Sequence, residues 1–186
     1  MSNSNAKEII KIGLILFAIT AISALLLAIA NKMTAPLIAT NQTKKTYASM
    51  RVVMPEANSF SPIDKAMLKG ASDGYFVLNK NNEKIGICLI TSANGYGGEV
   101  KVLTGIKDGK VTGIEILSHS ETPGLGAKST NPEFKSQYTD KVSDIKVSKS
   151  NAKDNEINAI SGATITSNAV TNAVNTALKI FEEVGK

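Results

Sequence analysis

Residues 12–30 form an apolar run without a single charged side chain. A helix rises about 1.5 Å per residue, so this run spans roughly 28 Å, close to the thickness of a hydrocarbon core. No small-residue cleavage pattern follows directly, because residues 31–34 read Asn-Lys-Met-Thr. The run therefore predicts an uncleaved membrane anchor rather than a removed signal peptide. A buried core helix is the alternative, but such a helix is rarely apolar on every face.

Lysines flank the apolar run on both sides, so the positive-inside rule does not decide its orientation. Only a short tail precedes the run, which places the bulk of the chain on the other side. The predicted division is a tail over 1–8, a transmembrane helix over 9–31, a helical connector over 32–72 and a folded domain over 73–186.

The formal net charge of +5 overstates how basic the folded domain is. Without Lys7, Glu8, Lys11 and Lys32, the chain keeps 18 basic and 15 acidic residues, a balance of +3. With no Trp and no basic patch interleaved with aromatic residues, nucleic acid is a poor candidate partner. Cys88 is the only cysteine, so neither an intrachain disulfide nor a cysteine-only metal cluster can form.

Alternating apolar residues predict four strands, at 75–78, 84–92, 99–106 and 110–117. Asp108-Gly109 is a strong hairpin signal, and short connections imply an antiparallel sheet. Helices are predicted over 37–54, near 63–68, over 131–138 and along an apolar stripe from Ala169 to Val184. Residues 140–156 read as a solvated connector with one weak strand near Ile145. The predicted fold class is α+β, with the sheet packed by helices.

Two loops of the domain carry polar residues and glycines. The segment Asn94-Gly95-Tyr96-Gly97-Gly98 lacks the spacing of a dinucleotide or P-loop motif, and its glycines equally fit turn chemistry. The segment from His119 to Gly126 contains a tight Pro-Gly turn and a glycine that leaves backbone exposed. Neither segment forms a Ser-His-Asp triad or a metal-ligand set. We therefore predict no catalytic base, nucleophile or metal site.

Small residues and hydroxyls meet in the segment 161–167, Ser-Gly-Ala-Thr-Ile-Thr-Ser, just before the terminal helix. Free backbone N–H groups and the helix dipole favour an anion at such a place, so the segment can hold a phosphate. One hydroxyl can also be esterified to that phosphate. The alternative is an ordinary N-cap, which spacing alone favours, because Ser and Thr oxygens commonly accept N–H bonds at helix starts.

Together the two segments carry a resemblance. His-x-Glu-Thr-Pro-Gly-Leu-Gly followed by Ser-Gly-Ala-Thr-x-Thr-Ser resembles the FMN-binding domain family. Known members are the G subunit of Rnf complexes, which are ferredoxin:NAD oxidoreductases, and the C subunit of the sodium-pumping NADH:quinone oxidoreductase. The resemblance covers most of the chain, and the short length and the Gly-Tyr-Gly-Gly-Glu-Val run look more like the Rnf G subunit.

The resemblance implies FMN attached through a phosphoester to Thr164, with Thr166 as the fallback acceptor. A flavin transferase makes this bond in the family, using FAD as the donor. The family pattern has Asp six residues before the acceptor, where this chain has Asn158, which puts docking of the transferase in doubt. The further cofactor-binding residues implied are Ser161, Gly162, Ala163, His119, Glu121, Thr122, Pro123, Gly124, Leu125, Gly126 and Tyr96.

The resemblance also implies a function and a location. The chain would be an electron-transfer flavoprotein subunit of a cell-membrane, ion-translocating oxidoreductase, with other membrane, iron–sulfur and flavin subunits as partners. Its N-terminus would be cytoplasmic and its main domain extracytoplasmic. Two alternatives stay open: a membrane-tethered extracytoplasmic module that binds a ligand noncovalently, and a structural assembly subunit without flavin.

Overall fold

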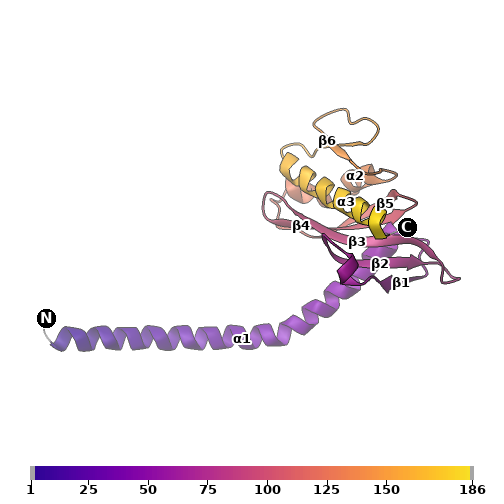
Figure 1. Cartoon of the computed structure of the whole chain (residues 1–186). Coiled ribbons are helices and arrows are strands. Elements are labelled where there is room, and N and C mark those ends of the chain that lie inside the picture. The colour runs from indigo at the N-terminus through magenta and orange to yellow at the C-terminus, as the bar shows by residue number, and fades with distance from the viewer. Residues whose placement is uncertain (1–2, 185–186) are drawn as a thin grey trace. The chain divides into compact units, whose positions relative to one another are not determined.

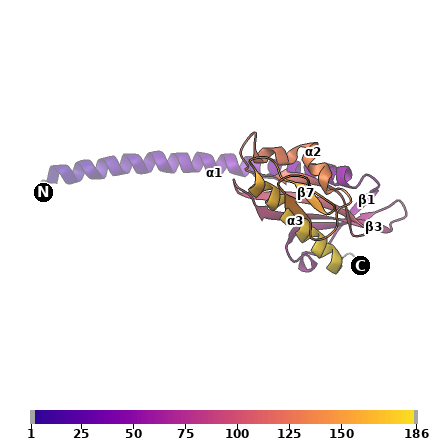
Figure 2. The same ribbon diagram turned by 90° about the horizontal axis from the view of Figure 1, so that it is seen from above.

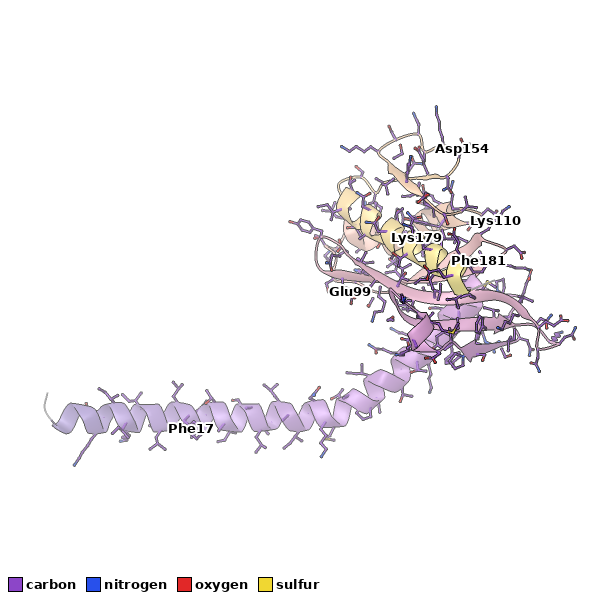
Figure 3. The ribbon with its side chains drawn as sticks, viewed as in Figure 1. Phe17, Glu99, Lys110, Asp154, Lys179 and Phe181 are labelled. Carbon is purple, nitrogen blue, oxygen red and sulfur yellow. The ribbon has the colours of Figure 1, made fainter. Side chains whose placement is uncertain are left out.

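The structure is a computed structural model that describes residues 3–184. The chain divides into two compact units, Met1–Lys44 and Lys45–Lys186. Helix α1 (Asn3–Val53) begins in the first unit, where its large apolar side chains, such as Phe17, are exposed (Figure 3). Among helices of the described residues, α1 alone is long and apolar enough to cross a membrane. The predicted anchor is thus a helix of suitable length and composition.

The second unit is built on a five-stranded antiparallel sheet (Figure 1). Its strands, in spatial and chain order, are β1 (Ser59–Pro62), β2 (Ala71–Leu78), β3 (Lys84–Asn94), β4 (Glu99–Lys107) and β5 (Lys110–Ser118). The four predicted strands are confirmed as β2 to β5, and β1 is an additional edge strand. The β4–β5 turn has positive φ at both Asp108 (51°) and Gly109 (76°), as a tight two-residue hairpin turn requires.

Shorter elements follow the sheet. They are 3-10 turns at Lys65–Met67, Gly126–Thr130 and Ser136–Tyr138, helix α2 (Pro132–Lys135), strands β6 (Lys146–Ser148) and β7 (Glu156–Asn158), and helix α3 (Thr164–Val184). The short helix predicted near 63–68 is confirmed as the 3-10 helix Lys65–Met67, which follows the end of β1 at Pro62. The predicted helix over 131–138 is split between α2 and a 3-10 turn. The predicted weak strand is β6, which pairs in parallel with β7.

Helix α3 lies across one face of the sheet (Figures 1 and 2). Its stripe of small residues, including Ala173 and Ala177, packs on alternate residues of β3, such as Ile87 and Leu89. Thr91 of the same strand donates a hydrogen bond of 2.8 Å to the carbonyl of Ala173. The alternation of side chains between the two faces of β3 thus determines which face α3 covers. Helix α3 begins at Thr164, so its position also determines where Thr164 lies.

The other face of the sheet is covered by the last turns of α1. Met50, Val53 and Met54 are almost fully buried against Cys88 and neighbouring apolar residues of the sheet. The hydroxyl of Thr112 in β5 donates a hydrogen bond of 2.7 Å to the carbonyl of Val53. Residues 45–54, β1 and the Lys65–Met67 turn therefore belong to the same compact unit as the sheet. The division into a connector over 32–72 and a domain over 73–186 stays a prediction.

Candidate functional site

The start of helix α3 is formed without a side-chain cap. Gly162 has φ of +75°, which turns the chain so that the N–H of Ala163 donates to the carbonyl of Ile160 at 2.9 Å. The carbonyl of Ala163 then accepts the first helical hydrogen bond, from Ser167 at 3.0 Å. Ala163 thus occupies the capping position and has no side-chain oxygen. No described group accepts from the N–H groups of residues 164–166, so these donors are available to an anion.

The hydroxyls around this helix start have different surroundings. Thr166 is buried, and its hydroxyl donates to the carboxylate of Glu121. Ser167 is buried as well; its hydroxyl accepts from the N–H of Ile160 at 2.9 Å and donates to the carbonyl of Ala163 at 3.0 Å. Thr164 is half-buried, and no described group bonds its hydroxyl. In the first turn of α3, Thr164 therefore carries the hydroxyl that has no hydrogen-bond partner among the described residues.

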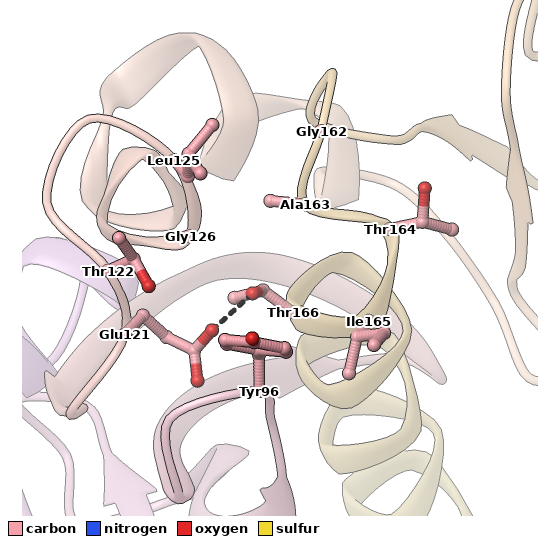
Figure 4. A pocket seen from close by; sticks show the side chains of 10 residues that line it. All are labelled: Tyr96, Glu121, Thr122, Leu125, Gly126, Gly162, Ala163, Thr164, Ile165 and Thr166. Carbon is pink, nitrogen blue, oxygen red and sulfur yellow. Dashed lines mark hydrogen bonds between the residues drawn. The ribbon is translucent and has the colours of Figure 1, made fainter.

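A cavity of about 590 Å³ lies beside the helix start (Figure 4). Glycine-rich segments far apart in the sequence contribute to it, together with the first turn of α3. Its lining residues are Tyr96, Glu121, Thr122, Leu125, Gly126, Gly162, Ala163, Thr164, Ile165 and Thr166. All except Ile165 belong to the set that the sequence predicts.

Glu121 ties the three segments of this site together. Its carboxylate is 5% exposed; Oε1 accepts from the N–H of Gly97 at 2.9 Å and Oε2 accepts from the hydroxyl of Thr166. Figure 4 shows the Thr166 hydroxyl turned toward this carboxylate and the Thr164 hydroxyl turned away from it. One side chain thus holds the loop at 94–98, the segment 119–126 and the first turn of α3 in a fixed relation.

Close packing around Glu121 explains two of the glycines. A Cβ atom on Gly97 would lie 2.0 Å from the carbonyl oxygen of Ser120, and one on Gly126 would lie 2.5 Å from Oε2 of Glu121. Any side chain at these positions would push the two segments apart. The glycines of the loop at 94–98 therefore allow close contact with the segment 119–126, a role in addition to the turn formation considered from the sequence.

Four predicted residues do not line the cavity: Ser161, His119, Pro123 and Gly124. The Nδ1 atom of His119 accepts a hydrogen bond of 3.2 Å from the backbone N–H of Glu121, and this bond fixes the orientation of the imidazole ring. Ile165, which sequence reasoning missed, is 55% exposed beside Thr164. The one feature of the sequence that could have indicated Ile165 is that this large apolar residue falls outside the buried stripe of α3. Among the described residues, no cluster of His, Cys, Asp and Glu side chains is suited to a metal ion.

Comparison with known proteins places this site within a family. A family model described as the FMN-binding domain matches residues 95–179, which include the loop at Tyr96 and the whole segment 161–167. The chain is 38% identical to the G subunit of the Na(+)-translocating ferredoxin:NAD(+) oxidoreductase complex of Acetobacterium woodii, over 97% of this chain and 95% of the relative. This chain belongs to the family of Rnf G subunits.

A second relative of this chain is the G subunit of the proton-translocating ferredoxin:NAD(+) oxidoreductase complex of Clostridium ljungdahlii. It is 36% identical, over 85% of this chain and 83% of the relative. Among solved structures, NqrC of Shewanella oneidensis matches with a TM-score of 0.52 and 18% identity over 70% of each chain. The C subunit of the Na(+)-translocating NADH-quinone reductase from Parabacteroides distasonis matches with a TM-score of 0.50 and 22% identity, over 60% of this chain and 61% of that one. These structures support the fold.

Proposed function

We propose that the chain is an electron-transfer subunit of a membrane-bound, ion-translocating ferredoxin:NAD oxidoreductase, and that it holds FMN as a phosphoester on Thr164. The observation that carries the proposal is the unbonded hydroxyl of Thr164, which lies at an uncapped helix start beside the cavity. It lies within the part of the chain that matches the FMN-binding domain.

The residues present fit FMN. The volume of about 590 Å³ lies within the range of about 300–1,000 Å³ that ligand-sized pockets have. Free N–H groups at the start of α3 suit a phosphate, and the side chains of Tyr96, Leu125 and Ile165 offer apolar and aromatic surface to a flat ring. When bound, FMN accepts and returns one or two electrons. The chain's own residues bind and orient it, and we assign no catalytic base or nucleophile for a separate substrate.

In this proposal Thr164 is the nucleophile in a single attachment step catalysed by a flavin transferase. Its Oγ1 forms a bond to the phosphorus on the FMN side of FAD, the bond from that phosphorus to the bridging oxygen breaks, and AMP leaves. The hydroxyl proton passes to a base of the transferase, and no electron is transferred. Thr166 is the poorer acceptor because it is buried and donates to Glu121.

The proposed location and partners are those that membership of this family suggests. We propose that α1 anchors the chain in the cell membrane with a cytoplasmic N-terminus, and that residues 45–186 lie outside the cytoplasm. A covalent bond prevents loss of the cofactor by dilution in that compartment. The partners would be the other membrane, iron–sulfur and flavin subunits of an Rnf-type complex, between whose centres FMN relays electrons.

The proposed function is tested by measuring whether flavin stays attached to the chain after denaturation. We expect the full chain, produced with a flavin transferase, to absorb as a flavoprotein and to keep its flavin through acid precipitation. A folded, colourless protein would favour the tethered binding module or the structural subunit. A yellow protein that loses all flavin on precipitation would contradict the covalent bond but would still support a noncovalent FMN site.

Asn158 provides a second prediction about attachment. Its side-chain oxygen accepts a hydrogen bond of 3.0 Å from the N–H of Ala152, an interaction that aspartate can also make. We expect Asn158→Asp to change the free energy of unfolding by less than about 0.5 kcal/mol. We expect it to raise the initial rate of covalent flavin attachment by roughly tenfold, the effect of one charge-assisted contact with the transferase.

Intact-mass spectrometry over time measures that rate. Asn158→Ala is the matched control, because it removes the bond to Ala152 without adding a charge, and should not accelerate attachment. Equal rates for wild type and Asn158→Asp would show that a carboxylate at this position is irrelevant to the transferase.

A further inference from the structure

The carboxylate of Glu121 is a buried charge without a cationic partner. It is 5% exposed, it lines the cavity, and its two oxygens are bonded by the uncharged N–H of Gly97 and hydroxyl of Thr166. The salt bridges of the described residues join Lys65 to Asp73, Lys107 to Glu56 and Lys135 to Glu115, and none involves Glu121. The negative charge of Glu121 is thus left uncompensated at the cavity wall.

Hydrogen bonds and packing hold this charge in place. One donor is directed at each of its two oxygens, the N–H of Gly97 at Oε1 and the hydroxyl of Thr166 at Oε2. A Cβ atom on Gly95 would lie 2.3 Å from Oε1, and one on Gly126 would lie 2.5 Å from Oε2, so backbone encloses the group on both sides. The carboxylate can therefore neither turn out to solvent nor approach a distant lysine without moving the loops.

A fixed charge at this depth acts on whatever fills the cavity. Bulk salt screens an exposed charge strongly, but it screens a buried one much less. The apolar side chains of Tyr96, Leu125 and Ile165 share the cavity wall, and displacing water from it lowers the local dielectric further. An electron added to a group in the cavity is therefore repelled by Glu121.

We propose that Glu121 lowers the reduction potential of the flavin in this cavity through its uncompensated charge. The inference rests on the proposed function, because it requires FMN at Thr164. Glu121 is a positioning and tuning residue: it holds the two loops and the first turn of α3, and it makes oxidation of the bound cofactor easier. It forms no bond to the cofactor in this proposal.

A redox titration of the flavin-loaded full chain tests the proposal. We expect Glu121→Gln to raise the midpoint potential, with a shift of about tenfold in the equilibrium constant, which is about 59 mV for a one-electron step. Glu121→Met provides a second uncharged variant of similar size if the amide is not tolerated. Glu121→Asp keeps the charge, and its potential should stay below those of both uncharged variants.

Glu99→Gln is the matched control, because Glu99 is an exposed carboxylate at the start of β4, bonded by Ser92. Solvent screens it, so its removal should leave the potential unchanged. Thermal unfolding of each variant checks the fold before titration. Uncharged variants that titrate at the wild-type potential, or below it, would overturn the proposal. A wild type without covalent flavin would instead overturn the proposed function.

Discussion

Thr164→Val leaves the domain folded and removes its covalent flavin: this is the result we expect from the geometry at the start of α3. Valine keeps the shape of threonine and its branched Cβ, and the hydroxyl that it replaces has no partner among the described groups. The free energy of unfolding should therefore change by less than about 0.5 kcal/mol. Loss of attachment should be complete, because the hydroxyls of Thr166 and Ser167 are bonded to other groups and Ser161 does not line the cavity.

Flavin fluorescence of the denatured band on a gel, together with intact mass, measures this result. Thr164→Ser keeps an acceptor and should keep the flavin. Thr166→Val removes the bond to Glu121 and should cost about 1–3 kcal/mol of stability, because it leaves a buried acceptor unsatisfied, yet it should keep the covalent flavin. Fluorescence that persists on the Thr164→Val band would place the ester elsewhere.

Truncation of the chain after the candidate membrane span should have the largest effect on stability. A fragment that begins at Lys45 keeps Met50, Val53 and Met54 on the sheet, whereas one that begins at Glu56 loses all three. Each of these side chains is at most 2% exposed. Removing a buried side chain of this size costs about 2–5 kcal/mol, and a whole domain is stable by only about 5–15 kcal/mol. The shorter fragment should therefore fail to fold stably.

The thiol of Cys88 reports on this packing. Burial raises its pKa to about 12, so the reactive thiolate is scarce at neutral pH in the intact domain. We expect slow labelling by Ellman's reagent in the Lys45 fragment and fast labelling in the Glu56 fragment.

In the full chain, Met50→Ala should destabilise the domain and Val52→Ala, an exposed position on the same helix, should not. Two fragments with equal melting temperatures would show that the end of α1 is dispensable.

Local patterns predicted the elements that depend on local chemistry. The Asp108-Gly109 turn, the alternation in β3 and the apolar stripe of α3 each appear in the structure where the sequence indicated them. Strand β1 was missed because it has four residues and ends in proline, a residue confined to sheet edges, so its pairing with β2 defines it. Strand β7 has three residues and likewise exists only through its pairing, here with the equally short β6.

The candidate site shows the same limit. Chain order placed Thr164 at the start of the terminal helix, and the segments around Tyr96 and Leu125 were recognised as motifs. What sequence did not supply is the bond between Glu121 and Thr166, which are 45 residues apart and belong to no shared period. Such a contact depends on how the loops fold back across the sheet, and this follows only from the packing of the whole domain.

The bonds made by Thr166 and Ser167 have a consequence for regioselectivity. Three alcohols crowd one helical turn, and a modifying enzyme would ordinarily need to discriminate among them. Two are already occupied, one by the carboxylate of Glu121 and one by the backbone around Ile160 and Ala163. In the proposed attachment, the choice of Thr164 would thus be encoded in the folded acceptor, and an enzyme of loose specificity would be sufficient to modify a single position.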